Sequence, residues 1–289
     1  MTGTVIDVRA VRDQQRAVWD HVSQGWRRWQ PDFERGAASV TARLLALAGI
    51  GPGLSVLDIG SGIGEPALSA ARAVGPTGKV TGIDLSAGMI AAARDAAAEL
   101  ANVEFLVGDL ETAQLAAGSF DAALSRWALM FAADRSELLR AAAAVLKPGG
   151  VLAAAVWGQP QDVPIISLGF RVISEQLGLP APPPGPGPFS MSDPQALRAD
   201  FEQAGFAEVE VSDVVAGFRF DSVEDFARFS RDVLPPGMKQ RILEQRGSIE
   251  DAGVWNAVAA AAREYQRADG TVSLPSLSRC VRAVAGGAA

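Results

Sequence analysis

The sequence predicts an α/β fold in which helices cover both faces of a doubly wound, mostly parallel sheet. Between residues 54 and 157, short apolar runs alternate with alanine-rich stretches of helical length. Strands and helices that alternate at this spacing form βαβ units, whose sheets are buried on both faces. Because the crossover connections of such units are right-handed, we expect a doubly wound sheet.

The elements of this region follow from the apolar pattern. Five apolar runs are expected as strands: SVLDI, KVTGIDL, VEFLVGD, FDAALS and GVLAAAVW. The helices between them are expected at residues 66–74, 87–100, 111–116 and 134–146. Residues 37–157 are therefore interpreted as the ligand-binding core.

Ahead of the core, the sequence predicts two helices. Apolar residues at positions 11, 18, 19, 22, 26 and 29 fall close to one face of a helix from Val11 to Trp29. Pro31 lacks a backbone donor and is expected to end this helix. A second helix is expected from Ala37 to Ala48, before Gly49. We interpret residues 1–36 as an N-terminal helical cap.

After Trp157 the regular alternation ends. Residues 158–190 and 221–270 are interpreted as helical insertions on the substrate side, and LPAPPPGPGPF within the first is expected to be a surface loop. SDPQALRADFEQAGF predicts a capped helix, and AEVEVSDVV and SLSRCVRAVA predict two further strands. Residues 191–220 and 271–289 thus complete a seven-stranded sheet. Because there is no internal repeat, residues 1–289 are interpreted as a single domain.

Composition excludes several functions. The chain has 289 residues and a formal net charge of −7, which suits nucleic-acid binding poorly. Cys280 is the only cysteine and His21 the only histidine, so thiolate and imidazole zinc sites are excluded and we assign no metal-ligating residue. We find no secretory signal and no apolar stretch that could span a bilayer, and we therefore expect a cytoplasmic protein. A homodimer is left open.

The segment DIGSGIG carries the strongest functional signal. It places Asp58 at the end of an apolar run and Gly60, Gly62 and Gly64 at alternate positions before a helix. Such turns hold phosphates, dinucleotides or S-adenosylmethionine, or are tight structural turns. A dinucleotide fingerprint needs a glycine where Glu65 stands, and a phosphate-binding Walker loop needs G-K-[ST], which is absent. Both observations disfavour phosphate ligands.

The segment VLDIGSGIGEPAL resembles the first motif of class I S-adenosylmethionine-dependent methyltransferases, and VLKPGGVLAAAVW is similar to the turn into their fifth strand. QQRAVWDHVSQGWRRW and SFDAALSRWALMF resemble the branch that contains the ubiquinone and menaquinone C-methyltransferases and many small-molecule methyltransferases. The resemblance implies a Rossmann-like sheet whose last strand is antiparallel, and S-adenosylmethionine as the cofactor. It also implies that the N-terminal segment closes over this cofactor.

Two acidic residues at predicted strand ends support this ligand. Asp84 follows the second strand, where a carboxylate can accept hydrogen bonds from both ribose hydroxyls, and Met89 can pack on the adenine. In the resembling family the residue at Asp109 accepts from the adenine amine, with the Leu110 backbone beside it. The full predicted cofactor set is Trp26, Asp58, Gly60, Ser61, Gly62, Gly64, Asp84, Leu85, Met89, Gly108, Asp109, Leu110, Ser125 and Arg126.

The acceptor is expected to be a small, partly apolar molecule, such as a phenol, quinol, isoprenoid or secondary metabolite, methylated on O, C or N. The residues predicted to line its pocket are Trp19, Trp127, Met130, Phe131, Ile166 and Phe170. Arg126 is also considered as a contact for an anionic group of the acceptor. His21 is the candidate general base, because its unperturbed pKa suits proton transfer near neutral pH.

Other interpretations remain or fail on particular residues. A short-chain dehydrogenase needs a Tyr-x-x-x-Lys pair, but Asp269 stands four residues after Tyr265, the only tyrosine. The sequence lacks the several cysteines that methylation of arsenic uses and the Asn-Pro-Pro signature of DNA methylation. It also lacks the clustered acids that aminopropyl transfer needs. The competing hypothesis is a non-catalytic S-adenosylmethionine-binding protein that serves as a regulatory partner.

Overall fold

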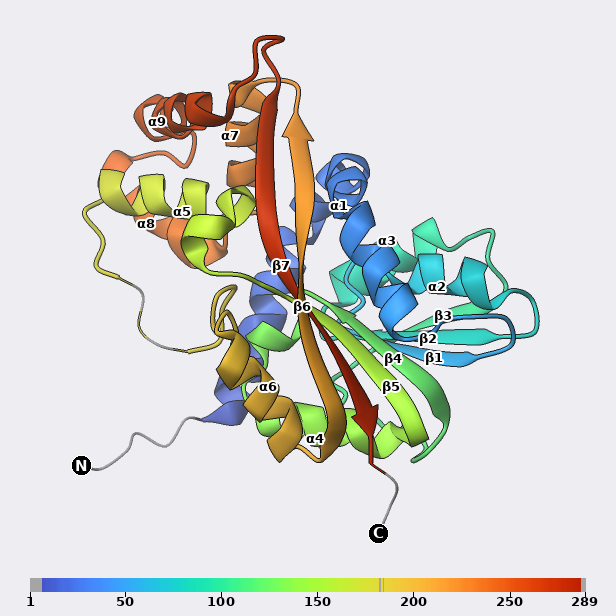
Figure 1. The fold of residues 1–289 in the computed structure, drawn as a ribbon. Coiled ribbons are helices and arrows are strands. Elements are labelled where there is room, and N and C mark those ends of the chain that lie inside the picture. The colour runs from blue at the N-terminus through green and yellow to red at the C-terminus, as the bar shows by residue number, and fades with distance from the viewer. Residues whose placement is uncertain (1–6, 182, 184, 287–289) are drawn as a thin grey trace.

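The structure, a computed structural model, describes residues 7–181, 183 and 185–286 (Figure 1). Residues 1–6, the start of the predicted N-terminal cap, lie outside the described residues. Residues 287–289, at the end of the predicted final sheet segment, also lie outside them. Within the described part, no helix has both the length and the apolar character needed to cross a bilayer.

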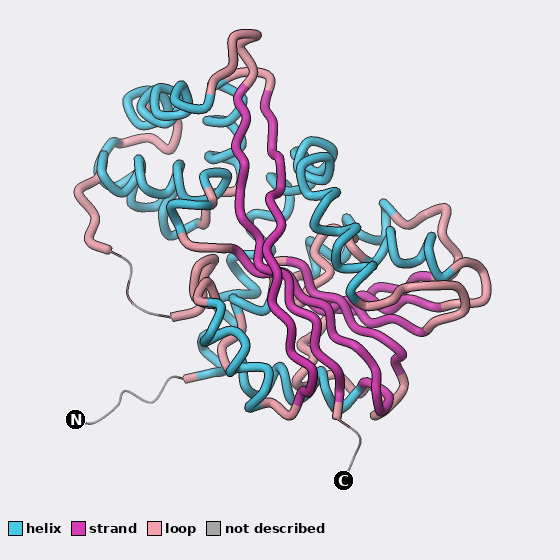
Figure 2. The backbone as a smooth tube through the Cα atoms, in the orientation of Figure 1, coloured by secondary structure: helices cyan, strands magenta, loops and turns pink. Residues whose placement is uncertain are grey.

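The central element is a seven-stranded sheet with the order β3-β2-β1-β4-β5-β7-β6 (Figure 2). Its first five strands are β1 (Ser55–Ile59), β2 (Lys79–Asp84), β3 (Val103–Val107), β4 (Phe120–Arg126) and β5 (Leu146–Trp157), and they run parallel. The last strand, β7 (Val272–Ala285), is antiparallel to both of its neighbours, β5 and β6 (Phe206–Phe220). The predicted doubly wound, mostly parallel sheet with an antiparallel last strand is confirmed.

The helices between the parallel strands are α2 (Ala67–Val74), α3 (Ala87–Ala96) and α4 (Arg135–Val145). They match three of the expected ranges. The fourth expectation, a short helix over residues 111–116, is wrong, because this segment forms a turn and a loop. The Asp109 carboxylate accepts from the Glu111 backbone N–H at 3.1 Å, which stabilises a local turn.

The N-terminal helix α1 (Val8–Leu47) corrects the prediction of two helices separated at Pro31. Pro31 lies inside one continuous helix of 40 residues. After Pro31, this helix buries Ala37, Val40 and Leu44 completely against the sheet. Burial of the Val40 and Leu44 side chains contributes about 3–6 kcal/mol to the free energy of folding. This gain offsets the roughly 3 kcal/mol that a proline inside a helix costs. The expected boundary between cap and core at residue 36 therefore falls inside α1.

The late part of the chain places a second group of helices beside the antiparallel strand pair β6–β7. Residues 278–284 of β7 pair with β5, whereas residues 272–277 pair with residues 215–220 of β6. The β6–β7 pair therefore runs past the end of β5, upward in Figure 1. Beside it lie α5 (Pro164–Gln176), α7 (Val223–Asp232), α8 (Pro236–Arg246) and α9 (Ala252–Ala262), whereas α6 (Pro194–Gln203) packs near the other end of β6. We call residues 215–220 and 272–277 of this strand pair, together with α5, α7, α8 and α9, the outer lobe.

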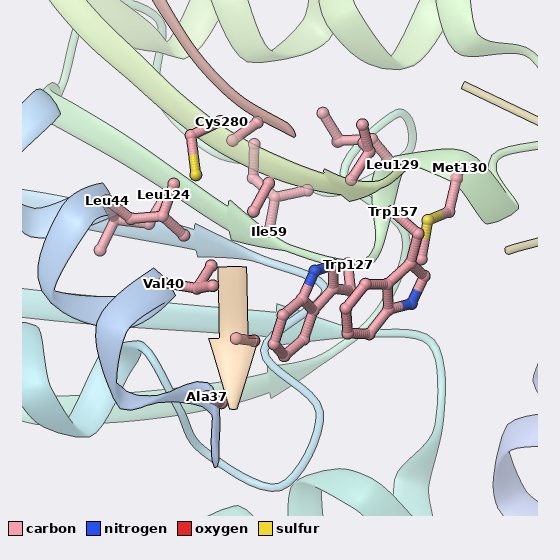
Figure 3. Packing of buried hydrophobic residues seen from close by; sticks show 14 of the residues in the cluster. Ala37, Val40, Leu44, Ile59, Leu124, Trp127, Leu129, Met130, Trp157 and Cys280 are labelled. Atoms are coloured by element: carbon pink, nitrogen blue, oxygen red, sulfur yellow. The ribbon is translucent and has the colours of Figure 1, made fainter. Parts of the chain in front are cut away.

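One buried cluster joins α1, the sheet and the outer lobe. Figure 3 shows side chains from α1 (Ala37, Val40, Leu44), β1 (Ile59) and β4 (Leu124) gathered together, with the paired rings of Trp127 and Trp157 beside them. Phe218 of β6 and Phe229 of α7 belong to the same cluster. Because α1 and β4 share this core, the carboxyl end of β4 has a fixed position relative to α1.

Candidate functional site

The candidate site lies at the carboxyl ends of β1, β2, β3 and β4, where open α/β sheets bind their ligands. Helix α1 contacts residues at or just after the carboxyl ends of all four strands. Asp20 accepts from the Ser86 hydroxyl at 2.6 Å and from the Gly88 N–H at 3.0 Å, just after β2. Gln30 donates to the Ile63 carbonyl oxygen at 3.1 Å, just after β1. The contacts to β3 and β4 are made by Arg12 and Glu34.

The glycine turn after β1 needs glycine for two different reasons. Gly60 has a φ of 70°, and a Cβ there would lie 2.3 Å from the Cβ of Ala128. Gly62 has a φ of 51°, but a Cβ there would meet no atom within 4 Å. Gly60 is thus required by close packing against the residue after Trp127, and Gly62 by its left-handed backbone. The open space beside Gly62 is where a ligand can approach the backbone.

Asp58, at the centre of β1's carboxyl end, is completely buried. One carboxylate oxygen accepts from the Ala67 N–H at 2.9 Å, at the start of α2. Burial raises the pKa of Asp58 to about 8, against the opposing effects of the Ala67 N–H and the Arg126 charge. The other oxygen, Oδ1, is buried and has no hydrogen-bond partner in the described part of the chain, and the same holds for the hydroxyl of Ser61. Buried polar atoms of this kind usually have a partner, so these two atoms fit a ligand with polar groups.

Asp84, at the end of β2, is fixed by two backbone donors. Its Oδ2 accepts from the Gly62 N–H and its Oδ1 from the Ser86 N–H, each at 2.9 Å. Burial raises the pKa of Asp84, whereas these two donors lower it. Each oxygen keeps a free lone pair, so the carboxylate can still accept from two hydroxyls of a ligand.

Asp109, two residues after β3, is held from α1. Its Oδ2 lies 2.8 Å from Nε of Arg12, and Arg12 also forms an ion pair with Glu111. Partial burial raises the pKa of Asp109, while the charges of Arg12 and Arg16 lower it. Neither Arg12 nor Glu111 was expected in the site. The only sequence signal for Arg12 was a basic residue in the first turns of the predicted cap, which is common on exposed helix faces.

The side chains of Ser125 and Arg126 have partners within the protein. The Ser125 hydroxyl is buried and donates to the Ile59 carbonyl oxygen at 2.9 Å, between β4 and β1. Arg126 donates to both oxygens of Glu34, at 2.5 and 2.7 Å, and to the Thr41 hydroxyl at 2.6 Å. Since this guanidinium is buried and donates to two side chains of α1, we do not assign Arg126 to the cofactor or to an anionic acceptor.

The remaining predicted cofactor residues divide by burial. Met89 is buried with Val22 and Ile63, and Trp26 packs beside this small cluster between α1 and α3. Trp26 also meets Phe33 edge to face at 4.9 Å. Leu110 is buried, whereas Leu85 and Gly108 are half-buried beside the ends of β2 and β3. Met89 and Trp26 are therefore packing residues of the cap interface.

Among the predicted acceptor residues, Trp19 and Phe131 are brought together. Their rings meet edge to face at 4.9 Å, and both are half-buried. Phe131 belongs to a short 3₁₀ helix, η1 (Leu129–Phe131), that follows β4. We call this pair the aromatic rim. It joins α1 to the end of β4, beside the glycine turn.

The structure contradicts the pocket predicted for Trp127 and Met130. Trp127 stacks on Trp157 at 4.1 Å and donates from Nε1 to the Ser278 hydroxyl at 2.8 Å. Met130 is 1% exposed, and its carbonyl oxygen accepts from Ser190 and Gly187. Both side chains are buried, so neither lines an open pocket.

Three more predicted residues lie apart from the aromatic rim. Ile166 and Phe170 lie on α5 in the outer lobe, half-buried against the core cluster. His21 is exposed, although its neighbours Asp20 and Val22 contact α3. This orientation gives no support to His21 as the general base.

Comparison with known proteins agrees with the sheet and its glycine turn. Residues 57–154 match the family described as "Methyltransferase domain". A demethylmenaquinone methyltransferase of Staphylococcus aureus (strain JH9) is 28% identical over 224 residues, which cover 73% of this chain and 92% of that protein. An uncharacterised 37.1 kDa protein in transposon TN4556 of Streptomyces fradiae is 42% identical over 109 residues, 38% of this chain. That match spans 31% of the transposon protein's length.

A solved structure shares the fold over nearly the whole chain. Phosphoethanolamine N-methyltransferase 2 of Haemonchus contortus, in complex with S-adenosyl-L-methionine, superposes with a TM-score of 0.57 at 19% sequence identity. The superposition covers 98% of this chain and 61% of that one. At this identity, the similarity shows the fold alone.

Proposed function

We propose that this chain, an S-adenosylmethionine-dependent methyltransferase with a class I core, methylates a small, partly apolar molecule on O, C or N. The observation that carries this proposal is the position of the aromatic rim. Trp19 and Phe131 stand in edge-to-face contact at 4.9 Å, and Trp19 packs on the small cluster that contains Ile63 of the glycine turn. A half-buried aromatic pair suits an acceptor with apolar or planar groups.

The residues at the strand ends fit the cofactor. S-adenosylmethionine carries an ammonium and a sulfonium but no phosphate, so acidic side chains suit it, and a bound ammonium would favour the charged form of Asp58. The buried Oδ1 of Asp58 and the buried hydroxyl of Ser61 both lack a partner among the described residues, beside a turn with open space at Gly62. We assign the methionine part of the cofactor to this turn, the ribose to Asp84 and the adenine to the region of Asp109.

When bound, the cofactor would supply the methyl group for the transfer, with S-adenosylhomocysteine as the leaving group. The chain's own contribution is orientation and exclusion of water. Asp84 is preset by the Gly62 and Ser86 N–H groups, so it can orient the ribose without rearrangement. Helix α1 covers the strand ends and brings Trp19 to the rim. Since His21 is exposed, the proposal relies on alignment rather than on this residue as a base.

Calorimetry with S-adenosylmethionine and S-adenosylhomocysteine tests cofactor binding, and a mass-spectrometric acceptor screen tests transfer. We expect both cofactor forms to bind, and small aromatic or isoprenoid acceptors to gain the mass of one methyl group. If neither S-adenosylmethionine nor S-adenosylhomocysteine binds, the proposal is contradicted.

A second candidate is a non-catalytic S-adenosylmethionine-binding protein. One observation favours it: both oxygens of Asp109 already have partners, since Oδ1 accepts from the Glu111 N–H and Oδ2 faces Arg12. Cofactor binding without transfer to any acceptor in the screen is the result expected for this candidate. Transfer to even one acceptor would exclude it.

A further inference from the structure

Trp127, the first residue after β4, has a left-handed backbone with a φ of 56°. Among the described residues, Glu208 is the other non-glycine residue with a positive φ, and it lies where the register between β6 and β7 shifts. A bulky residue adopts this conformation only where its surroundings fix it, and such residues concentrate at functional sites. Trp127 is in no bulge, so its conformation needs another explanation.

Four contacts hold Trp127 in place. Its backbone N–H donates to the Ala155 carbonyl oxygen of β5 at 2.7 Å, and its Nε1 donates to the Ser278 hydroxyl of β7 at 2.8 Å. The indole stacks on Trp157 with an interplanar angle of 12° (Figure 3). The Arg126 guanidinium lies 5.1 Å from the centre of the indole. The turn is therefore anchored to β5 and β7, on the side of β4 that faces away from β1.

The consequence of this turn appears in the next four residues. Ala128 packs closely on the glycine turn, because a Cβ added at Gly60 would lie only 2.3 Å from the Cβ of Ala128. Phe131, three residues further, meets Trp19 of α1. One face of this short segment thus contacts the proposed donor site, and its end forms the proposed acceptor rim.

We propose that Trp127 is a positioning residue, whose anchored left-handed turn sets Ala128 against the glycine turn and Phe131 against Trp19. It thereby fixes the donor site relative to the acceptor rim. Trp127 acts through these neighbours, since its own indole is buried in the core. The inference rests on the proposed function, because the two sites that it aligns are those assigned above.

Two serines on β7 provide a matched pair of variants. Ser276 and Ser278 are both completely buried, but only Ser278 accepts from the Trp127 indole. The Ser276 hydroxyl instead accepts from the Ile165 N–H at 3.3 Å, in the outer lobe. Ser278→Ala therefore loosens the Trp127 anchor, and Ser276→Ala removes a comparable buried hydroxyl without touching it.

The measurements are S-adenosylhomocysteine affinity by calorimetry and amide hydrogen exchange over residues 57–68. We expect Ser278→Ala to weaken the affinity about three- to tenfold, the equivalent of one lost hydrogen bond, and to speed exchange in the glycine turn. Ser276→Ala should leave both readouts at their wild-type values, even where it lowers the melting temperature as much as Ser278→Ala does. A purely structural role for Trp127 predicts equal effects of the two variants, which would overturn the proposal.

Ala128→Gly supplies a second, independent variant at a half-buried position. It removes the methyl group that contacts Gly60, so we expect the same weakening of affinity and the same faster exchange. If Ser278→Ala does not fold, unchanged affinity and exchange in Ala128→Gly would overturn the proposal alone. Failure of the wild-type chain to bind S-adenosylhomocysteine would instead contradict the proposed function, and the exchange comparison would still test the anchor.

Discussion

Glu34 of α1 holds Arg126 at the end of β4 through a two-point ion pair, with distances of 2.5 and 2.7 Å. The Arg126 side chain is 5% exposed and that of Glu34 is 21% exposed. The Thr41 hydroxyl, further along the same helix, accepts from the same guanidinium. The pair thus fixes α1 to the strand that leads into the aromatic rim, on the side of Pro31 that is packed against the core.

Removing one partner of this pair should destabilise the fold strongly. We expect Arg126→Met to lower the free energy of unfolding by about 3 kcal/mol, because Glu34 is left without its counter-charge in a mostly buried position. Urea denaturation measures this loss. The matched control is Arg140→Met, whose partner Glu137 lies on the same helix and whose side chain is 53% exposed. This control should cost at most about 1 kcal/mol.

The double variant Glu34→Gln/Arg126→Met tests whether the loss comes from the unpaired charge. We expect it to be more stable than the sum of the two single variants predicts, because a neutral amide at position 34 needs no counter-charge. Additive losses would show that the two side chains act independently.

Asp84→Ala should weaken S-adenosylhomocysteine binding by about 1–3 kcal/mol through lost charge-assisted hydrogen bonds. Isothermal calorimetry measures the change. Asp95→Ala on α3 is the control, since the Asp95 side chain is 63% exposed and pairs with Arg27 on the surface. Equal affinities for the Asp84 variant and the wild type would remove Asp84 from the proposed site.

Burial of Asp58 should make stability depend on pH. Its pKa rises from 3.8 to about 8 in the folded chain, so the folded state keeps a proton that the unfolded state releases. The stabilisation from this proton is present below the unfolded pKa and is lost as the pH rises toward the folded one. Between about pH 5 and 7, the free energy of unfolding should therefore fall by up to about 1.4 kcal/mol per pH unit relative to Asp58→Asn. Urea titrations at several pH values give this difference, and parallel curves for the two proteins would contradict it.

Pro31→Ala tests the continuity of α1. In an unbroken helix, alanine restores a backbone donor and removes a steric clash, so the free energy of unfolding should rise by about 1–3 kcal/mol. Thermal and urea unfolding measure this gain. A loss of stability would instead indicate that the chain uses a break at Pro31, as the sequence had suggested.

The sheet could be predicted well because its signals are local. Each parallel strand is a short apolar run that ends in a turn, as in SVLDI before the glycines. The positions of Asp58, Asp84 and Asp109 near strand ends could be predicted for the same reason, because each follows from where a local apolar run ends. The continuity of α1 was missed because it depends on Val40 and Leu44 packing against distant strands. Propensity around Pro31 contains no information about that packing.

The sequence by itself determined the doubly wound sheet, the glycine turn and the acidic residues at its strand ends, because periodicity and turn chemistry act over a few residues. Only the tertiary structure decided which side chains near β4 are free for a ligand. Arg126 is taken up by Glu34, and Trp127 by Ser278 and Trp157, all of them partners far away along the chain. Such partners are chosen by packing of α1 and β7 around β4, where a buried charge or indole N–H must be satisfied.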